Sequence, residues 1–287
     1  MLKLLLQLDS SRLPSVFDQV VAYDAGADRI MSEGGVTEGD VRDLVHGCIF
    51  TRGPKDMQNT AIFIGGADMS IGEKLLAATN KAFFANFRVS TMLDSNGSNT
   101  TAVAAVVKIT QALGGSVKGR KIVVTAGTGP VGTRAAGLFA KAGADVTITS
   151  RKPEDAERVS AEICKRFGGT VKSVPMRDPS QAAAAIEGAE VLLNAGPAGV
   201  MLVPRAAWAG KFKVVADLNA VPPLGVEGIE VTDDGQSREG AIGFGALGVG
   251  NFKMKVHKEC LRRLFTRNDL VLDAETIEDV AKEILTK

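Results

Sequence analysis

A short glycine-rich segment constrains the fold of this chain more than any other feature. An apolar, β-branched run, Ile122–Val124, leads into the pattern Gly127-x-Gly129-x-x-Gly132, and a second apolar run, Val146–Ile148, follows a helix-like stretch. The order strand, glycine turn, helix, strand is the opening unit of a dinucleotide-binding Rossmann fold. The segment therefore predicts a parallel α/β sheet that binds a dinucleotide phosphate at the start of its first helix.

Each glycine of this turn has an expected mechanical role. Gly127 allows the tight turn, Gly129 lets a pyrophosphate approach the backbone, and Gly132 lets the helix pack close to the strand. Pro130 suits the first helical turn, where a missing N–H costs little. A glycine turn without a ligand is the alternative, which the strand–turn–helix–strand context makes the weaker one. The residues expected at the pyrophosphate are Gly127, Thr128, Gly129, Pro130, Val131 and Gly132.

The end of the second strand indicates which dinucleotide is bound. An NAD site would carry Asp or Glu there, bound to the ribose 2′-hydroxyl. This chain instead has Ser150, Arg151 and Lys152. Two cations and a hydroxyl suit a 2′-phosphate, so the expected cofactor is NADP. The alternative is a solvated basic helix start, since Lys and Arg are common at protein surfaces.

The arrangement of apolar runs predicts a two-domain α/β protein with a cleft between the domains. Strands alternate with helices on both sides of the linker-like segment 114–119, and this alternation is typical of parallel sheets. We expect a smaller N-terminal substrate domain over residues 1–113 and a Rossmann-type dinucleotide-binding domain over residues 114–250. The C-terminal helices, residues 251–287, are expected to pack near the cleft or back on the first domain.

The composition of the chain limits the kinds of binding partner that the sequence favours. The 34 basic and 33 acidic residues nearly cancel, so neither nucleic acid nor an anionic membrane is favoured as a partner. No run reaches the roughly 20 apolar residues that a bilayer span needs. Cys48, Cys164 and Cys260 are far apart, and His46 and His257 stand alone, so no metal site is expected. Unpaired cysteines of this kind indicate a reducing, cytoplasmic location.

Polar residues gather in loops that we expect to follow strands. Three such loops are residues 51–58, 94–101 and 217–219. Ligands bind at the carboxyl ends of strands in open parallel sheets, so these loops are candidate sites. Local rules alone favour a turn and helix cap for residues 94–101, because every residue there favours turns. Further candidates for cofactor contact are Asn194, Ala195, Gly196, Asp217 and Asn219.

The chain shows no recognisable acid–base apparatus beside its dinucleotide motif. It has no nucleophile elbow, no metal-ligand spacing and no Tyr-x-x-x-Lys pair, since its only tyrosine is Tyr23. Oxidising an alcohol requires a base that removes the hydroxyl proton. Oxidising a methylene held between two nitrogens requires none, because the nitrogen lone pairs stabilise the cation. The pattern therefore favours hydride transfer by alignment and charge stabilisation.

The whole chain resembles the bacterial NADP-dependent methylene-tetrahydromethanopterin dehydrogenases of one-carbon metabolism. Its most specific segment is Met92-Leu-Asp-Ser-Asn-Gly-Ser-Asn-Thr-Thr101, and this reverses the local preference for a mere cap. The other matching segments are 14–18, 23–28, 49–53, 60–66, 126–132, 219–225 and 244–248. The resemblance implies a pterin-binding lobe and an NADP-binding lobe, homo-oligomers, and no metal or flavin. It also implies hydride transfer from the methylene carrier to NADP, giving the methenyl carrier and NADPH.

Site residues follow from the same resemblance. Asp94, Asn96 and Asn99 are expected to face the pterin, and Lys253 or Lys255 is expected to be functional, although the two lysines equally fit an exposed basic helix face. Asp94 is further expected to stabilise the product cation. With two neighbours from the polar loops, the expected substrate contacts are Arg52, Asp94, Asn96, Asn99 and Thr100.

Several alternatives remain open on the residues alone. The fold also suits a dihydropterin reductase, a shikimate-dehydrogenase-like alcohol oxidation or a non-catalytic NADP sensor. The alcohol oxidation requires a Lys–Asp pair in the first lobe, and none is convincing. The residues do not separate methanopterin from tetrahydrofolate as the carrier, and they do not exclude the use of NAD.

Overall fold

Each half of the chain builds its own parallel sheet. The computed structural model, which describes residues 1–286, divides into unit 1, Met1–Thr100 together with the segment from Met254 onward, and unit 2, Thr101–Lys253. The chain enters unit 2 within helix α4 (Ser98–Ala112) and returns to unit 1 within helix α9 (Ala246–Arg263). The domain limits expected from the sequence stay a prediction.

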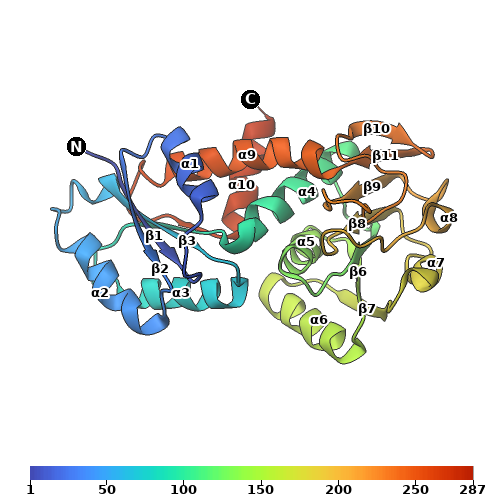
Figure 1. Ribbon diagram of the computed structural model, residues 1–287, viewed down its shortest axis with the longest axis horizontal. Helices are drawn as coiled ribbons and strands as arrows, with labels where there is room; N and C mark the ends of the chain where they lie inside the picture. The colour runs from blue at the N-terminus through green and yellow to red at the C-terminus, as the bar shows by residue number, and fades with distance from the viewer. Residues whose placement is uncertain (287) are drawn as a thin grey trace. The chain divides into compact units, whose positions relative to one another are not determined.

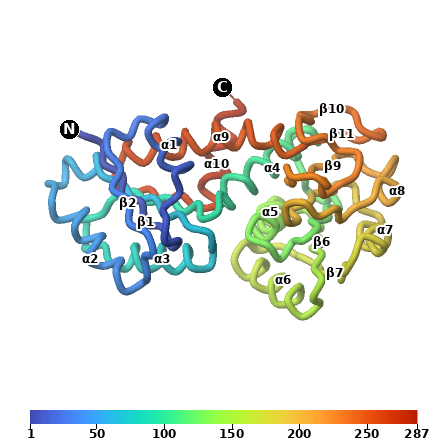
Figure 2. Tube along the Cα trace, in the orientation of Figure 1, coloured from blue at the N-terminus to red at the C-terminus, as the bar shows by residue number. Residues whose placement is uncertain are grey.

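Unit 1 contains a sheet of five strands, counted over residues 1–286, in the order β12-β4-β3-β1-β2 with every neighbouring pair parallel. Figures 1 and 2 label β1 and β2 of this sheet and the helices α1, α2 and α3. The strands are β1 (Leu4–Asp9), β2 (Arg29–Gly34), β3 (Thr60–Gly65), β4 (Ser90–Leu93) and β12 (Val271–Leu272). The helices are α1 (Val16–Asp24), α2 (Glu38–Ile49), η1 (Met57–Asn59), α3 (Met69–Ala82), η2 (Ser95–Gly97) and α10 (Ala274–Leu285).

The position of each strand in this sheet follows from its side chains. All six residues of the central strand β3 are buried, and its Ala-Ile-Phe-Ile run suits a strand covered on both faces. Helices α2 and α3 pack together on one face, whereas α1 lies on the other (Figure 1). The edge strand β2 is different, because Ile30 is half-buried and every other residue in it is exposed.

Unit 2 contains a seven-stranded sheet in the order β10-β11-β9-β8-β5-β6-β7. All of its strand pairs are parallel except β10 with β11. The strands are β5 (Lys121–Thr125), β6 (Asp145–Ser150), β7 (Val171–Pro175), β8 (Val191–Asn194), β9 (Val214–Asp217), β10 (Asp234–Arg238) and β11 (Ala241–Phe244). The helices are α5 (Pro130–Lys141), α6 (Pro153–Phe167), η3 (Pro179–Gln181), α7 (Ala182–Ala185) and α8 (Arg205–Trp208). The strand order reverses direction between β5 and β8, which is where open α/β sheets bind ligands.

Helix α6 illustrates how local sequence fixes an element of this unit. Pro153 begins the helix, acidic residues occupy its first turn and basic residues its last, as the helix dipole favours. Gly168 ends it with a φ of 77°, a conformation that costs glycine little. The helix packs against α5 beside strands β6 and β7.

Some expected elements differ from those observed. The short apolar pattern after Thr37 favours a helix only as far as Val45, but α2 continues to Ile49. The helix begins with a capping box, in which the Asp40 carboxylate accepts hydrogen bonds from the N–H and hydroxyl of Thr37 at 2.9 and 2.6 Å. Strand β2 and the β10–β11 hairpin had no clear sequence signal, because their residues are largely polar, glycine or exposed. Within residues 1–286, no helix combines the length and hydropathy of a membrane-spanning segment.

Candidate functional site

The glycine turn of unit 2 lies between β5 and α5, as its spacing predicts. Pro130 is the first residue of α5 and Gly129 is its N-cap. The role expected of Gly127 in the tight turn is not observed. The residue with left-handed backbone is Ala126, with a φ of 51°, and not Gly127. A Cβ on Gly127 would lie 2.6 Å from the Cβ of Ile148, so this glycine is required by packing against β6 rather than by the turn.

Packing within the protein requires a glycine at position 132 but not at position 129. A Cβ on Gly132 would lie 2.7 Å from the Cα of Gly127, which confirms the expected close packing of helix and strand. A Cβ on Gly129 would meet only the carbonyl oxygen of Ala126, at an ordinary 3.5 Å. The protein itself therefore gives no steric reason for glycine at position 129. A phosphate on the N-terminus of α5 supplies that reason, so the turn fits a dinucleotide.

Buried polar side chains join the carboxyl ends of three strands in unit 2. The hydroxyl of Thr125 donates to Oδ1 of Asn194 at 2.7 Å, and Nδ2 of Asn194 donates to Oδ1 of Asp217 at 2.7 Å. Both Asn194 and Asp217 are fully buried, and burial raises the pKa of the Asp217 carboxyl. Gly225 is required by this network, because a Cβ there would collide with the Asn194 amide. These two predicted residues thus align strand ends beside the glycine turn.

The loops after β8 and β9 hold the remaining predicted residues of this edge. Ala195 and Gly196 are half-buried and follow β8 directly, and the N–H of Gly196 donates to Oδ1 of Asn194 at 3.3 Å. Asn219 is buried, with its amide accepting from the N–H of Val221 and donating to the carbonyl of Pro223. The amide side chains of Asn194 and Asn219 are thus engaged within the protein.

The end of β6 gathers positive charge. Ser150 is buried, whereas Arg151 and Lys152 are exposed and make no ion pair within residues 1–286. The neighbouring strand β7 adds a third cation that sequence analysis missed. Its Pro175 is paired with Ser150, and the next residue but one is Arg177, which is exposed and likewise without an ion pair in that range. The sheet register, which no local pattern reveals, brings these groups to one edge.

In unit 1 the expected substrate loop folds as a buried cap on α4. Asp94 is fully buried, and its carboxylate accepts from the backbone N–H of Thr100 at 2.9 Å and from the Thr100 hydroxyl at 2.6 Å. Asn99 is also buried, and its Nδ2 donates to the carbonyl of Leu93 at 2.6 Å. Asn96 is exposed, with a left-handed φ of 54°. Asn96 is thus the side chain of this loop that is open to a ligand.

Other polar residues of unit 1 were not singled out from the sequence. Asp9 ends β1, is buried, and accepts from the N–H groups of Ser11 and Ser15. His257 is fully buried, stacks on Phe63 with ring centroids 5.8 Å apart, and has its Nε2 4.0 Å from Oδ1 of Asp18. An acidic residue directly after a buried strand was a usable signal for Asp9. The place of His257 depends on a contact almost 240 residues distant along the chain.

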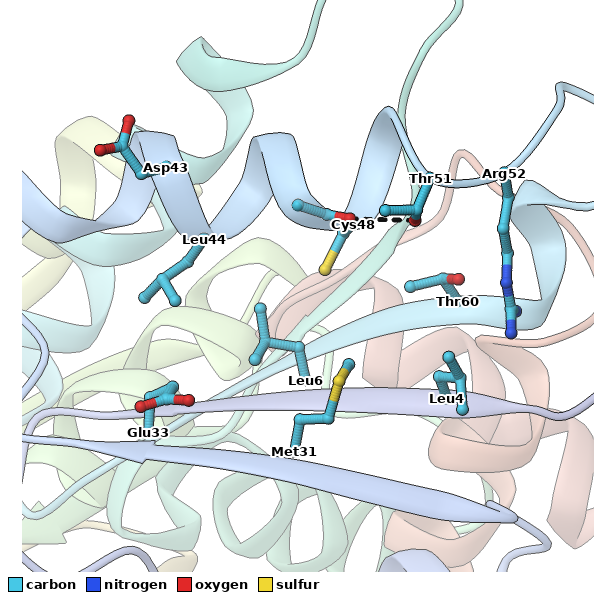
Figure 3. A pocket seen from close by; sticks show the side chains of 11 residues that line it. Leu4, Leu6, Met31, Glu33, Asp43, Leu44, Cys48, Thr51, Arg52 and Thr60 are labelled. Carbon is cyan, nitrogen blue, oxygen red and sulfur yellow. Dashed lines mark hydrogen bonds between the residues drawn. The ribbon is translucent and has the colours of Figure 1, made fainter.

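Arg52 is not brought near the residues around Asp94. The loop of residues 51–58 was expected to follow a strand, but it follows helix α2 and precedes β3, which places it at the amino end of the sheet. Its guanidinium donates to the carbonyl of Asn59 at 2.6 Å. Arg52 lies at one end of a groove of about 460 Å³ between α2 and strands β1 and β2, where Leu44 and Cys48 point from the helix toward the strands (Figure 3).

The two candidate lysines differ in exposure. Lys253 is 9% exposed, whereas Lys255, two residues further along α9, is exposed. Burial singles out Lys253, because a lysine is seldom buried without a partner or a role. Sequence alone could not choose between them.

Comparison with known proteins decides the family. The family model described as methylene-tetrahydromethanopterin dehydrogenase, N-terminal, matches residues 16–96. A "bifunctional protein MdtA" from Methylorubrum extorquens is 49% identical over 98% of this chain and 99% of its own length. An "NAD(P)-dependent methylenetetrahydromethanopterin dehydrogenase" from the same organism is 34% identical over 94% of each. The chain belongs to the methylene-tetrahydromethanopterin dehydrogenase family.

Solved structures support the fold of this family member. Shikimate 5-dehydrogenase from Listeria monocytogenes, solved with shikimate and NAD, matches with a TM-score of 0.59 at 15% identity, covering 99% of this chain and 96% of that one. Likeness at this identity shows the two-domain Rossmann-type fold and nothing further. The expected fold class is thereby confirmed.

Proposed function

We propose that the protein transfers hydride between methylene-tetrahydromethanopterin and NADP, giving the methenyl carrier and NADPH, in cytoplasmic one-carbon metabolism. The observation that carries the cofactor assignment is the set of unpaired cations after β6 and β7, which suits a 2′-phosphate. The curated relative named as an NAD(P)-dependent dehydrogenase supports the reaction. Methylene-tetrahydrofolate is a second carrier that we include in the proposal.

In this proposal unit 2 binds the cofactor. The pyrophosphate contacts the backbone from Gly127 to Gly132, where Gly129 leaves the room that a phosphate needs. Ser150 and the cations after β6 and β7 bind the 2′-phosphate. The nicotinamide side is formed by the loops that follow Asn194 and Asp217, whose buried hydrogen bonds hold the strand ends in place. NADP, when bound, supplies the hydride acceptor.

Unit 1 binds the pterin in the same proposal. We assign the contact to the carboxyl edge of its sheet, where Asn96 is exposed and Asp94 holds the loop that carries it. Asp94 is proposed as a positioning residue, because its buried carboxylate is engaged by Thr100. Lys253 is proposed as the functional lysine. Loss of hydride from a methylene between two nitrogens releases no proton, so the site needs no general base.

A direct assay tests the proposed function. Purified protein is mixed with NADP and either methylene-tetrahydromethanopterin or methylene-tetrahydrofolate, and NADPH is followed by absorbance. With the methanopterin carrier, we expect the kcat/KM for NADPH formation from NADP to exceed the kcat/KM for NADH formation from NAD. If the protein binds NADP but turns over neither carrier, the proposed enzymatic function is wrong and the NADP-sensing alternative is favoured. NADPH consumption with a dihydropterin would favour the reductase.

A further inference from the structure

The groove between α2 and strands β1 and β2 has the size of a small-molecule site. Its volume is about 460 Å³, and binding pockets for small ligands span roughly 300–1,000 Å³. Figure 3 shows helix α2 along one side and the strands along the other. Asp94, Asn96 and Lys253, which the proposed function assigns to the pterin, are not among the residues that line it. The groove is therefore a separate feature of unit 1.

Thr60 places a buried hydroxyl at one end of this groove. The residue is 2% exposed and lines the groove, and its Oγ1 makes no hydrogen bond within residues 1–286. Buried hydroxyls nearly always have a partner, because an unpaired one costs free energy. Valine would have the same shape without this cost. A polar group that enters the groove explains why a hydroxyl is present here.

Arg52 places a positive charge at the same end of the groove (Figure 3). The residue is half-buried, and its Nη1 donates to the carbonyl of Asn59 at 2.6 Å. It makes no ion pair within residues 1–286. A guanidinium has five N–H donors, so others remain for a second acceptor. A carboxylate suits this end, because its two oxygens can accept from Arg52 and Thr60 together.

The middle of the groove is apolar. Leu4 and Leu6 line it from β1, Met31 from β2, and Leu44 from α2 (Figure 3). Cys48 belongs to the same part, and burial raises the pKa of its thiol to about 11, so the thiol is neutral at physiological pH. An aliphatic chain that lies here would remove apolar surface from water.

The other end of the groove is acidic. Glu33 and Asp43 line it, and both are exposed (Figure 3). Thr60 is level with Leu4 in the sheet, whereas Glu33 is level with Leu8. These levels are four residues apart along β1, which is about 13 Å. Because Glu33 and Asp43 repel an anion, a ligand with a single carboxylate takes one orientation, with that group at Arg52.

We propose that this groove binds a linear aliphatic monocarboxylate. The carboxylate accepts hydrogen bonds from Thr60 and Arg52, and the alkyl chain lies along the leucines toward Glu33. An extended octanoate is somewhat shorter than the separation of the two ends, so it fits within the groove. The site lies within unit 1 and does not depend on the proposed activity.

Titration with three ligands of equal chain length tests the class of ligand. Calorimetry of the whole protein is carried out with octanoate, octanol and octanedioate. We expect octanoate to bind saturably, one per chain, in the millimolar range or below. Octanol lacks the charge and should bind about tenfold more weakly. Octanedioate should also bind more weakly than octanoate, because its second carboxylate lies near Glu33.

Three outcomes of this titration would overturn the proposal. Octanoate that does not bind saturably would exclude the site. Octanol that binds as tightly as octanoate would show that the carboxylate is not recognised. Octanedioate that binds as tightly as octanoate would contradict the proposed orientation.

Variants on both sides of the groove test its location. Thr60→Val keeps the shape of the side chain and should weaken octanoate about tenfold without lowering the melting temperature. Gly47 lines the groove from α2, and a Cβ there would meet no atom within 4 Å. Gly47→Leu should therefore fold, gain helix stability and weaken octanoate about tenfold by covering the groove. Gly39→Leu, on the same helix but not in the lining, is the matched control and should bind octanoate normally.

Stability and binding move in opposite directions in this design, so misfolding cannot imitate the expected result. Octanoate affinity that is unchanged in both Thr60→Val and Gly47→Leu would place any binding elsewhere on the protein and refute the assigned groove.

Discussion

Gly129 separates the needs of the fold from those of the ligand. Alanine at this position meets only an ordinary contact within the protein, so Gly129→Ala should fold normally. Its methyl group would occupy the space that a pyrophosphate needs, so NADP affinity should fall at least tenfold, about 1.4 kcal/mol. Gly127→Ala is the contrasting variant, because its Cβ collides with Ile148 and should destabilise the fold. Calorimetric titration and thermal unfolding measure both effects, and unchanged NADP affinity in Gly129→Ala would refute the assigned pocket.

Arg151 and Arg177 should discriminate between the two nicotinamide cofactors. Loss of either guanidinium removes a charge-assisted contact with the 2′-phosphate, so each alanine variant should weaken NADP by roughly 1–3 kcal/mol. NAD lacks that phosphate, and its affinity should stay the same. Arg158→Ala, on the side of α6, is the control. Titration with NADP, NAD and 2′,5′-ADP checks this.

The outcomes for these arginines separate two hypotheses. If Arg151→Ala loses NADP affinity and Arg177→Ala does not, β7 takes no part in the site and the cofactor assignment still holds. If both variants lose NADP and NAD equally, the cations do not recognise the 2′-phosphate.

The positions of residues in the fold were predictable where the sequence pattern is local. The turn from Gly127 to Gly132 and the cations after β6 are contiguous in sequence, so spacing was sufficient to locate them. It failed for Arg52, because the loop's position at the amino end of the sheet depends on α2 reaching Ile49. It also missed Arg177, which the register of β6 and β7 brings beside Ser150.

At the scale of elements, Asp94 caps helix α4, and Thr100 offers the matched test of this role. Asp94→Asn and Thr100→Val each remove part of the same cap, so each should lower the free energy of unfolding by about 1 kcal/mol. Turnover should fall to a similar, small extent in both. A tenfold to thousandfold loss of kcat in Asp94→Asn alone would instead show that the carboxylate charge stabilises the product cation.

Glu190 links three strands of unit 2 at their amino ends. Its carboxylate accepts from Nζ of Lys213 at 2.6 Å and from Arg120 at 2.8 Å, and these bonds lower its pKa from an ordinary 4.5 to about 2. A pKa lowered by folding contributes stability above the unfolded value and loses it as the pH falls through the folded one. Glu190→Gln should therefore destabilise unit 2 by about 1 kcal/mol at pH 7, and this difference should vanish between about pH 4.5 and pH 2.

The single tryptophan makes this measurement specific to unit 2. Trp208 is fully buried there, and its indole donates to the carbonyl of Glu227 at 2.9 Å, so its fluorescence reports the unfolding of that unit. Glu187→Gln is the control, since Glu187 is exposed. A difference between wild type and Glu190→Gln that persists unchanged at pH 2 would show that packing, and not charge, causes the effect.

Elements were predictable in proportion to how much their side chains are buried. The central strand β3 is buried throughout, and its apolar run Ala-Ile-Phe-Ile is typical of such a strand. Strand β2 is exposed along most of its length and offers no alternation, so it was missed. Strand β12 has two residues and exists because it pairs with β4, from which it is separated by about 180 residues. Local patterns carry no information on such a pairing.

Under the proposed function, hydride passes from the pterin assigned to unit 1 to the NADP assigned to unit 2. Hydride leaves the methylene carbon with both bonding electrons, and the nitrogens on either side stabilise the cation that remains. No proton moves in this step, so no side chain has to be deprotonated for it. The imidazole of His257 in unit 1 is fully buried and stacked on Phe63. The rate of hydride transfer should therefore stay constant from about pH 6 to pH 9.

Single-turnover formation of NADPH, with hydrogen and with deuterium on the methylene carbon, isolates the chemical step from product release. A constant rate with an undiminished isotope effect across this range is the expected result. A tenfold fall per pH unit below neutrality, with the isotope effect retained, would reveal a titrating base and contradict the mechanism. His257→Gln would then identify the group, because the acid limb should disappear if the imidazole is the base and persist if another side chain is. Under the proposed mechanism, neither substrate carrier alters this pH independence, since both hold the reacting carbon between two nitrogens.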